Sequence, residues 1–153
     1  MLAKRHADAL QSMETAVEVR ISIDTNLLAV RMSLQRLLSS TQFAKLTDDS
    51  KSTVEIVLAE ALNNVVEHAQ TQPGDCVNLI AVCRLDTLKF TISDNGLPMP
   101  GSRLPSGSLQ SLTSLPEGGF GWFLIRRLSH SVTYRRVKGC NMLSFCVAVD
   151  YVS

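Results

Sequence analysis

Hydrophobic and polar residues alternate near the beginning of the chain. Val17, Val19, Ile21 and Ile23 are separated by polar residues, and a period of two is typical of a strand with one buried face. The preceding residues, 1–15, show only weak periodicity and are expected to form a tail outside the core. The pattern therefore predicts one folded domain over residues 16–153 that opens with a strand.

The hydrophobic spacing then becomes helical. Apolar residues between 27 and 38 recur at intervals of three and four, and Asp24 or Thr25 is the predicted N-cap of this helix. A second helix is predicted to begin after Thr47 or Asp48 and to run to about residue 69. Acidic side chains at its start complement the positive end of the helix dipole.

Two pairs of strands and one short helix are predicted in the remainder. The strands cover residues 77–84 and 87–93, with a turn at Leu85-Asp86, and residues 132–137 and 142–151, with a turn at Lys138-Gly139; the helix covers 122–128. Residues 94–121 are rich in Gly, Pro and Ser, and no regular element fits them. A long irregular stretch within a compact domain favours a lid or a binding loop.

The order of these elements indicates the fold class. It reads strand, helix, helix, strand, strand, long loop, helix, strand, strand. Neighbouring strands joined by short turns pair in an antiparallel manner, and the helices must bury their apolar faces against the sheet. The sequence thus predicts a two-layer α/β sandwich with a mostly antiparallel sheet.

Composition and charge limit the classes of partner. Lys and Arg total 15 against 14 for Asp and Glu, a net charge of +1, which offers no broad field for nucleic acid or for a membrane surface. The four cysteines lack metal-binding spacing and are expected to be reduced and buried. The N-terminus is too polar for a signal peptide, and no apolar run approaches the roughly 20 residues of a membrane span, so a cytoplasmic protein is expected.

Polar residues at helical spacing interrupt the apolar pattern of the second helix. Glu60, Asn64 and His68 are four residues apart and therefore share one side of the helix. A carboxylate and a carboxamide one turn apart can orient a water molecule and offer an oxygen ligand to Mg²⁺. The same spacing also fits a solvated helix face, and His68 alone more often packs or caps a helix end.

Two further motifs follow along the chain. Asp94 and Gly96 end a predicted buried strand, where a carboxylate can accept a hydrogen bond from a ligand amine while glycine allows close backbone approach. Gly118, Gly119 and Gly121 precede the last helix, whose N-terminus can bind a phosphate. Taken singly, the first is an ordinary turn signal and the second an ordinary flexible connection.

Taken together and in this order, the motifs carry a family resemblance. Glu60-x-x-x-Asn64, Asp94-x-Gly96-x-Pro98 and Gly119-x-Gly121 resemble the N, G1 and G2 boxes of the gyrase, histidine kinase and heat-shock chaperone (GHKL) ATPases. Over about residues 17–150 the chain is similar to the anti-sigma factor serine kinases of that superfamily, through Glu60-Ala61-x-x-Asn64-x-x-x-His68-Ala69 and Glu117-Gly118-Gly119-x-Gly121-x-x-Leu124-Ile125. The resemblance implies a Bergerat-type ATP-binding fold.

The resemblance also implies roles for individual residues. Asn64 is expected to coordinate the Mg²⁺ that bridges the ATP phosphates, and Glu60 to act as general base toward the attacking hydroxyl. Asp94 is expected to accept the adenine amino proton beside Gly96, in the adenine pocket. The remaining family positions are the phosphate-binding glycines, Gly118, Gly119 and Gly121, and the ATP lid over 97–117.

The implied function is that of an ATP-dependent serine kinase that phosphorylates a STAS-type anti-anti-sigma protein, sequesters a sigma factor and forms a homodimer. Kinases of the family can carry a lid arginine near the last glycines, whereas this chain has Leu115-Pro116-Glu117 there. Arg103 is the only arginine within the lid and lies far from these glycines in sequence. This departure keeps open a nucleotide-binding partner-switching module without kinase activity. A globular domain unrelated to nucleotides is a third reading.

Several residues outside the motifs fit structural roles. Trp122 and Phe123 are expected in the core, although a protein-binding anchor is an alternative. Four arginines close to one another in sequence are expected on a solvated face, with a docking patch as the alternative: Arg126, Arg127, Arg135 and Arg136. Asn141 and Ser144 are candidates for a polar contact to adenine near the final strand, and neither is assigned.

Overall fold

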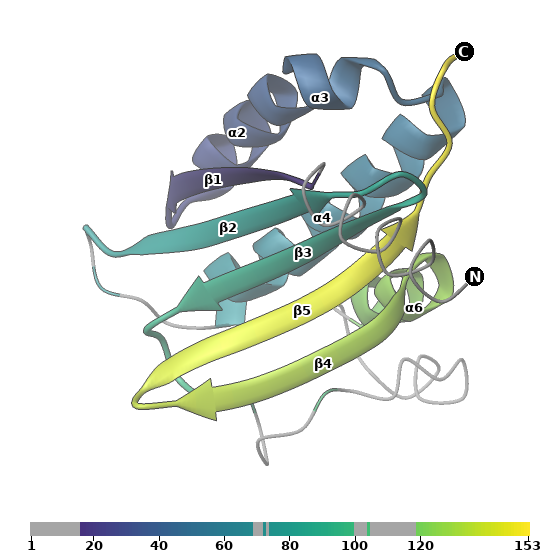
Figure 1. The fold of residues 1–153 in the computed structure, drawn as a ribbon. Helices are drawn as coiled ribbons and strands as arrows, with labels where there is room; N and C mark the ends of the chain where they lie inside the picture. Colours follow the sequence, from purple (N-terminus) through teal and green to yellow (C-terminus); the bar gives the residue numbers. More distant parts are fainter. Residues whose placement is uncertain (1–15, 69–71, 73, 100–103, 105–118) are drawn as a thin grey trace, which may run out of the picture.

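The chain folds into one sheet with helices on one side. The structure, a computed structural model shown in Figure 1, describes residues 16–68, 72, 74–99, 104 and 119–153. In chain order its elements are β1 (Val17–Asp24), α2 (Leu27–Ser39), α3 (Thr41–Ala44), α4 (Asp48–His68), β2 (Cys76–Cys83), β3 (Thr87–Asp94), α6 (Gly119–Leu128), β4 (His130–Val137) and β5 (Cys140–Ala148).

The sheet has five strands in the order β1-β2-β3-β5-β4, and every neighbouring pair is antiparallel. The turns at Leu85-Asp86 and Lys138-Gly139 join the two predicted hairpins, β2–β3 and β4–β5. Lys138 and Gly139 have φ angles of 50° and 76°, and this left-handed conformation favours glycine at the second position. The predicted antiparallel sheet is confirmed.

Helices α2, α4 and α6 gather on one face of the sheet, as Figure 1 shows. Side chains on alternate positions of β3 and β5 point into the layer between sheet and helices, where they are buried: Leu88, Phe90, Ile92, Leu143, Phe145 and Val147. The Phe90 ring lies at the centre of this core, with ring centroids 6.4 Å from Phe43 and 5.6 Å from Phe145. The two-layer α/β sandwich is therefore confirmed.

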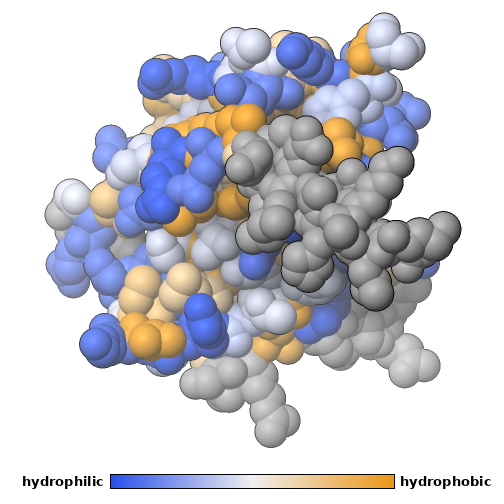
Figure 2. All heavy atoms as spheres, viewed as in Figure 1, coloured by the Kyte–Doolittle hydropathy of each residue, from blue (hydrophilic) through white to orange (hydrophobic). Residues whose placement is uncertain are grey.

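The opposite sheet face faces the viewer in Figure 2, which shows hydrophilic and hydrophobic residues interspersed over it. Thr91 and Ser144 lie on this face, and their hydroxyl oxygens are 3.1 Å apart. Cys146 is on the same side because it neighbours core-facing residues in β5. All four cysteines are free, as predicted, but they are half-buried and not buried.

Several predicted element boundaries were wrong. The N-cap of α2 is Asn26, whose side-chain oxygen accepts a hydrogen bond from Ala29 N at 2.8 Å. Asp24 cannot cap the helix because it is the last residue of β1, and the Thr25 hydroxyl lies 3.4 Å from the carbonyl oxygen of Asp75. Helix α3 was missed because four residues are too few to show a period, although it buries Phe43.

The later boundaries also differ. Helix α6 begins at Gly119, three residues before the predicted start at Trp122. Glycine is a poor residue for a helix interior, but a helix can begin with it, and the sequence pattern does not distinguish the two cases. Strand β5 ends at Ala148, three residues before the predicted end, although Val149 N still donates to Asp86 O at 3.0 Å in the β3–β5 register.

One remaining prediction concerns the start of the domain and another concerns membrane spans. Residues 1–15 lie outside the described residues, so the boundary between tail and domain stays a prediction. Over the described ranges, no helix has both the length and the apolar character to cross a membrane.

Candidate functional site

Helix α4 places the first motif against α6. Its apolar stripe is fully buried beneath the sheet and includes Val57, Leu58, Ala61 and Leu62. On the adjoining stripe Glu60 is half-buried, and Asn64 is only 8% exposed. The interpretation of a solvated helix face is therefore wrong for Asn64, and Glu60 beside it is only partly exposed.

Gly121, in the glycine motif before the last helix, lies directly against Glu60 and Asn64 of the first motif. A Cβ atom built on Gly121 would lie 2.8 Å from Glu60 Oε2 and 3.5 Å from both amide atoms of Asn64. A contact of 2.8 Å is too short for any side chain, so Glu60 would have to move to make room. Glycine at this position therefore allows the first turn of α6 to lie directly against the polar stripe of α4.

Asn64 carries an unsatisfied hydrogen-bond donor in this contact. Its Nδ2 atom is buried and has no hydrogen-bond partner within the described residues. A buried amide without a partner costs about 1–3 kcal/mol, so such groups are few in native proteins and mark places where a ligand completes the structure. Asn64 lies beside the beginning of α6, where unpaired backbone N–H groups and the helix dipole favour an anion.

The same contact also suits Mg²⁺. The Asn64 amide supplies a hard oxygen, Oδ1, next to a helix N-terminus suited to phosphate. Within the described ranges, no three or more His, Cys, Asp or Glu residues cluster in a way that could hold a metal ion. Mg²⁺ needs no such cluster when nucleotide phosphates and water complete its coordination, so the residues present fit a Mg²⁺–nucleotide complex.

Asp94 ends β3 at the edge of the helix layer and is 5% exposed. Its Oδ1 atom accepts hydrogen bonds from Gly96 N at 2.8 Å and from Asn141 Nδ2 at 3.0 Å. Gly96 is buried, and its amide turns back toward the carboxylate. In the described part of the chain, hydrogen bonds reach only one oxygen of Asp94, so Oδ2 remains available to accept a hydrogen bond from a ligand.

Three residues around Asp94 were not assigned from the sequence. Asn141 is 6% exposed, and its Oδ1 atom accepts hydrogen bonds from the Tyr134 hydroxyl at 2.6 Å and from Arg136 at 2.8 Å. Arg136 also donates to Gly96 O at 2.9 Å. Arg136 is exposed, as expected of a solvated face, and in addition its guanidinium holds the loop that follows β3, which the sequence did not predict.

A sequence signal for these residues existed. Asn141 directly precedes the predicted strand over residues 142–151 and is the second residue of the observed β5; asparagine is depleted in strands, so its presence there indicates a specific partner. The turn at Lys138-Gly139 also fixes Arg136 opposite Asn141 in the hairpin. The sequence did not reveal that β3 pairs with β5, which is what brings Asp94 to Asn141.

The remaining predicted residues are placed as follows. Gly119 is the first residue of α6, whereas Gly118 and nearly all of the predicted lid lie outside the described residues. His68 is the last residue of α4, and its side chain is also outside the description. Trp122 is 6% exposed and belongs to the core, as expected. Ser144 faces the opposite side of the sheet, away from Asp94.

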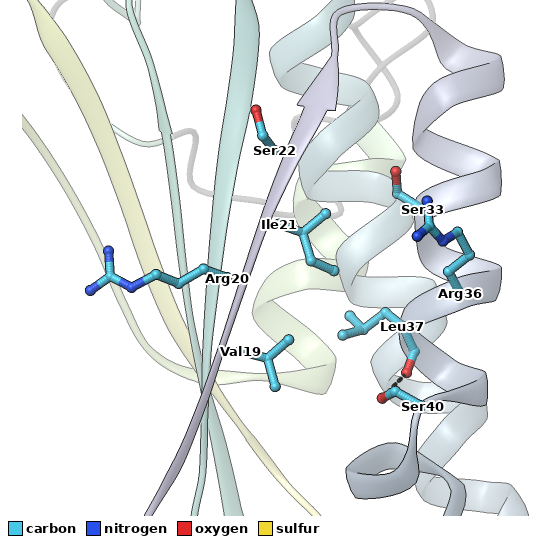
Figure 3. Close-up of a pocket in the computed structure, with 8 residues that line it drawn as sticks. All are labelled: Val19, Arg20, Ile21, Ser22, Ser33, Arg36, Leu37 and Ser40. Carbon is cyan, nitrogen blue, oxygen red and sulfur yellow. Dashed lines mark hydrogen bonds between the residues drawn. The ribbon is translucent and has the colours of Figure 1, made fainter.

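A separate groove lies between β1 and α2 and has a volume of about 410 Å³. Figure 3 shows Val19 and Ile21 directed toward α2, whereas Arg20 points away from the helix. None of the three motifs contributes to the lining, which consists of Val19, Arg20, Ile21, Ser22, Ser33, Arg36, Leu37 and Ser40. The groove is therefore distinct from the candidate site.

The sheet order, the helix layer and the contact between Asn64 and Gly121 define a histidine kinase-like ATPase domain. The family model described as the histidine kinase-like ATPase domain matches residues 23–147, which is most of the chain. Serine-protein kinases RsbW from Staphylococcus aureus strains bovine RF122 and JH9 are each 30% identical to the chain over 139 residues, covering 85% of both sequences. The chain belongs to this family of anti-sigma factor serine kinases within the histidine kinase-like ATPases.

Solved structures show the same fold at lower sequence identity. The RsbU and RsbW domains of Rv1364c from Mycobacterium tuberculosis superpose with a TM-score of 0.58 at 13% identity over 90% of this chain, which spans 35% of that longer chain. The mycobacterial sensor histidine kinase MprB superposes with a TM-score of 0.50 at 14% identity, over 88% of this chain and 100% of that one. At these identities the two structures support the fold alone.

Proposed function

We propose that the protein is an ATP-dependent serine kinase and anti-sigma factor, which phosphorylates a STAS-type anti-anti-sigma protein and sequesters a sigma factor. The observation that carries the proposal is the meeting of Glu60, Asn64 and the first turn of α6 at Gly121. A carboxylate, an unsatisfied amide and a helix N-terminus in contact supply a base, a metal ligand and a phosphate site. The similarity to the RsbW serine-protein kinases of Staphylococcus aureus supports the same reaction.

In this proposal the adenine base of ATP binds at Asp94, and the phosphates bind at the beginning of α6. Asp94 Oδ2 accepts a hydrogen bond from the adenine amino group, because Oδ1 already accepts hydrogen bonds from Gly96 and Asn141. The phosphates lie at the beginning of α6, among Gly118, Gly119 and Gly121, and residues 97–117 form the lid. A guanine base presents a carbonyl oxygen where adenine presents the amino group, so the Asp94 carboxylate disfavours it.

Asn64 is the proposed protein ligand of Mg²⁺. When bound, Mg²⁺ neutralises charge on the phosphate oxygens that develops during phosphoryl transfer. The nearby Nδ2 atom of Asn64 gains an acceptor when the nucleotide is present, which removes the cost of leaving that donor unsatisfied.

Glu60 is the proposed general base. No hydrogen-bond or ion-pair partner of Glu60 is found in the described residues, and its Oε2 atom lies at the first turn of α6. From there the carboxylate can accept the proton of a serine hydroxyl that attacks the terminal phosphate, and a base acts only from within hydrogen-bond reach. Positioning and charge stabilisation supply most of the catalysis in phosphoryl transfer, so few protein groups are needed.

A phosphorylation assay tests this proposal. Wild type, Glu60→Gln and Glu55→Gln are incubated with Mg·ATP and the cognate anti-anti-sigma protein, and phosphoserine is measured by mass spectrometry. Glu55 is exposed on the same helix and makes the matched control. We expect Glu60→Gln to bind ATP normally and to transfer phosphate at least about a hundredfold more slowly, the lower end of the range for loss of a general base. The control should match wild type.

Two results would change the conclusion. If Glu60→Gln retains the wild-type rate, Glu60 is not the base. If wild type binds ATP but leaves the partner serine unmodified, the chain is a nucleotide-binding partner-switching module, which the Leu115-Pro116-Glu117 sequence at the lid favours. Homodimerisation and a cytoplasmic location are part of the proposal, and sedimentation at micromolar concentration tests the first.

A further inference from the structure

We propose that Asn141 is a positioning residue for nucleotide recognition, and that it acts by fixing the Asp94 carboxylate so that only Oδ2 faces the base. The inference rests on the proposed binding of ATP and deepens it, since it names the residues that set selectivity for a 6-amino purine. Asn141 itself does not touch the nucleotide. Its partners in this task are Tyr134 and Arg136.

The sheet register places these groups in one row. Asp94 on β3 is the direct partner of Asn141 on β5, and Asn141 is in turn the direct partner of Arg136 on β4. Directly opposite residues point to the same side of a sheet, so all three side chains lie on the helix face at one end of the strands. Asp94 and Asn141 are buried whereas Arg136 is exposed, and buried polar groups are costly unless each one is hydrogen-bonded.

The hydrogen-bond inventory of Asn141 is complete within the protein. Its two N–H donors are taken by Asp94 Oδ1 at 3.0 Å and by Leu97 O at 2.8 Å, with Gly96 O at a longer 3.4 Å. Its carbonyl oxygen accepts from Tyr134 at 2.6 Å and from Arg136 at 2.8 Å. An asparagine amide has two donors and two acceptor lone pairs, so nothing is left for a ligand.

The same residues hold the backbone that follows Asp94. Arg136 and Asn141 reach the carbonyl groups of Gly96 and Leu97, and the Tyr134 hydroxyl accepts a hydrogen bond from Met99 N at 3.1 Å. The loop from Asp94 to Met99 is thereby tied to β4 and β5 at several points. Asp94 cannot rotate its carboxylate without breaking the bonds from both Gly96 and Asn141 to Oδ1.

A ligand comparison separates positioning from general stability. Mg·ATP and Mg·purine riboside triphosphate, which lacks the 6-amino group, are titrated into wild type, Asn141→Ala and Ser144→Ala by calorimetry. Ser144 is the matched control because its hydroxyl pairs with Thr91 across the same two strands on the opposite face. We expect Asn141→Ala to bind ATP roughly tenfold more weakly and to bind the deamino nucleotide within about twofold of wild type.

The outcomes distinguish this inference from the proposed function. If Asn141→Ala weakens both nucleotides equally, or weakens neither, the positioning role is overturned while ATP binding stands. If wild type binds neither nucleotide, the proposed function fails and this inference falls with it. Should Asn141→Ala unfold, Tyr134→Phe, which removes one hydrogen bond to Asn141, is expected to reduce the preference for ATP by roughly threefold. An unchanged preference in that variant would overturn the proposal.

Discussion

Within the described residues, strands β3 and β5 have hydrogen-bonded polar groups at one end and polar groups without partners at the other. At the end near Thr87 and Ala148, the C-terminal segment pairs with its surroundings: Val149 N donates to Asp86 O at 3.0 Å, and Asp150 N donates to Ser50 Oγ at 2.9 Å. Figure 1 shows this segment leaving β5 beside α3 and α4. At the other end, Asp94 Oδ2 and Asn64 Nδ2 lack hydrogen-bond partners in the described part of the chain.

The difference shows which end stabilises the domain and which end binds. Backbone pairing at the closed end satisfies buried groups and holds α4 to the sheet, which adds stability without leaving a place for a ligand. The buried, unsatisfied Asn64 Nδ2 at the open end costs free energy until a ligand supplies an acceptor. Substitutions at the open end should therefore change binding or turnover more than stability, and those at the closed end should do the reverse.

The largest effect is expected from Asp94→Asn. The asparagine oxygen can keep the bonds from Gly96 N and Asn141 Nδ2 to Oδ1, but the second carboxylate oxygen becomes an N–H donor that opposes the adenine amino group. We expect ATP affinity to fall about a hundredfold with a change in unfolding free energy within about 1 kcal/mol. Calorimetric titration and urea unfolding measure the two quantities.

Asp86→Asn is the control at the closed end of the same strand. The Asp86 carboxylate is exposed and accepts one hydrogen bond, from the Thr87 hydroxyl at 3.2 Å. Its ATP affinity should match wild type. Equal loss of affinity in the two variants would contradict the division between the ends.

Gly121→Ala is expected to lower turnover while leaving the fold intact. The added methyl group would lie 2.8 Å from Glu60 Oε2, and the end of that flexible side chain can move away from its working position. Alanine also favours the helix by up to about 1 kcal/mol, which offsets the strain. The phosphoryl-transfer rate should fall roughly tenfold or more, since small misplacements of a catalytic group are costly.

Gly74→Ala is the control for Gly121→Ala, because it is expected to lower stability without changing the rate. Gly74 has a φ of +93° and open space around its Cα, so alanine there is strained without meeting other atoms. It should lower the unfolding free energy by about 1–2 kcal/mol and leave the rate unchanged. A Gly121→Ala protein with full activity would show that Glu60 does not depend on this contact.

Ser50→Ala removes a hydrogen bond at the closed end of the sheet. Ser50 is 7% exposed, and its hydroxyl accepts the hydrogen bond from Asp150 N, so the variant leaves this N–H without that partner. We expect a loss of about 1–2 kcal/mol of unfolding free energy with unchanged ATP affinity. Weaker ATP binding of the folded Ser50→Ala protein would show that the two ends are coupled.

The smallest effect concerns Cys83 on β2. Burial raises the pKa of its thiol, so the reactive thiolate is scarce near neutral pH. Alkylation by iodoacetamide at pH 8, followed by peptide mass spectrometry, should be slower for Cys83 in the folded protein than in urea. The rate should rise once the pH passes the raised pKa. Equal rates in both states would show that the thiol is accessible and unperturbed.

Much of the fold followed from local patterns. Alternation at residues 17–23 and helical spacing at 27–38 predicted the first strand and helix, and two short turns predicted the hairpins. These signals are readable because each depends on residues close together in the chain. The wrong N-cap and the missed α3 arose where a boundary depends on where the preceding element ends.

For the candidate site, the sequence by itself determined which chemical groups occur and in what order: the Glu60 carboxylate and Asn64 amide one helical turn apart, Asp94 before Gly96, and glycines before the last helix. Only the tertiary structure decided that Gly121 lies against Glu60 and Asn64 and that Asp94 pairs with Asn141. It also decided that Arg136 holds the loop that follows Asp94. The physical reason is that spacing along a helix or strand fixes which side chains share a face. Contacts between distant segments depend instead on the order in which strands join the sheet and on the close packing of helices over it.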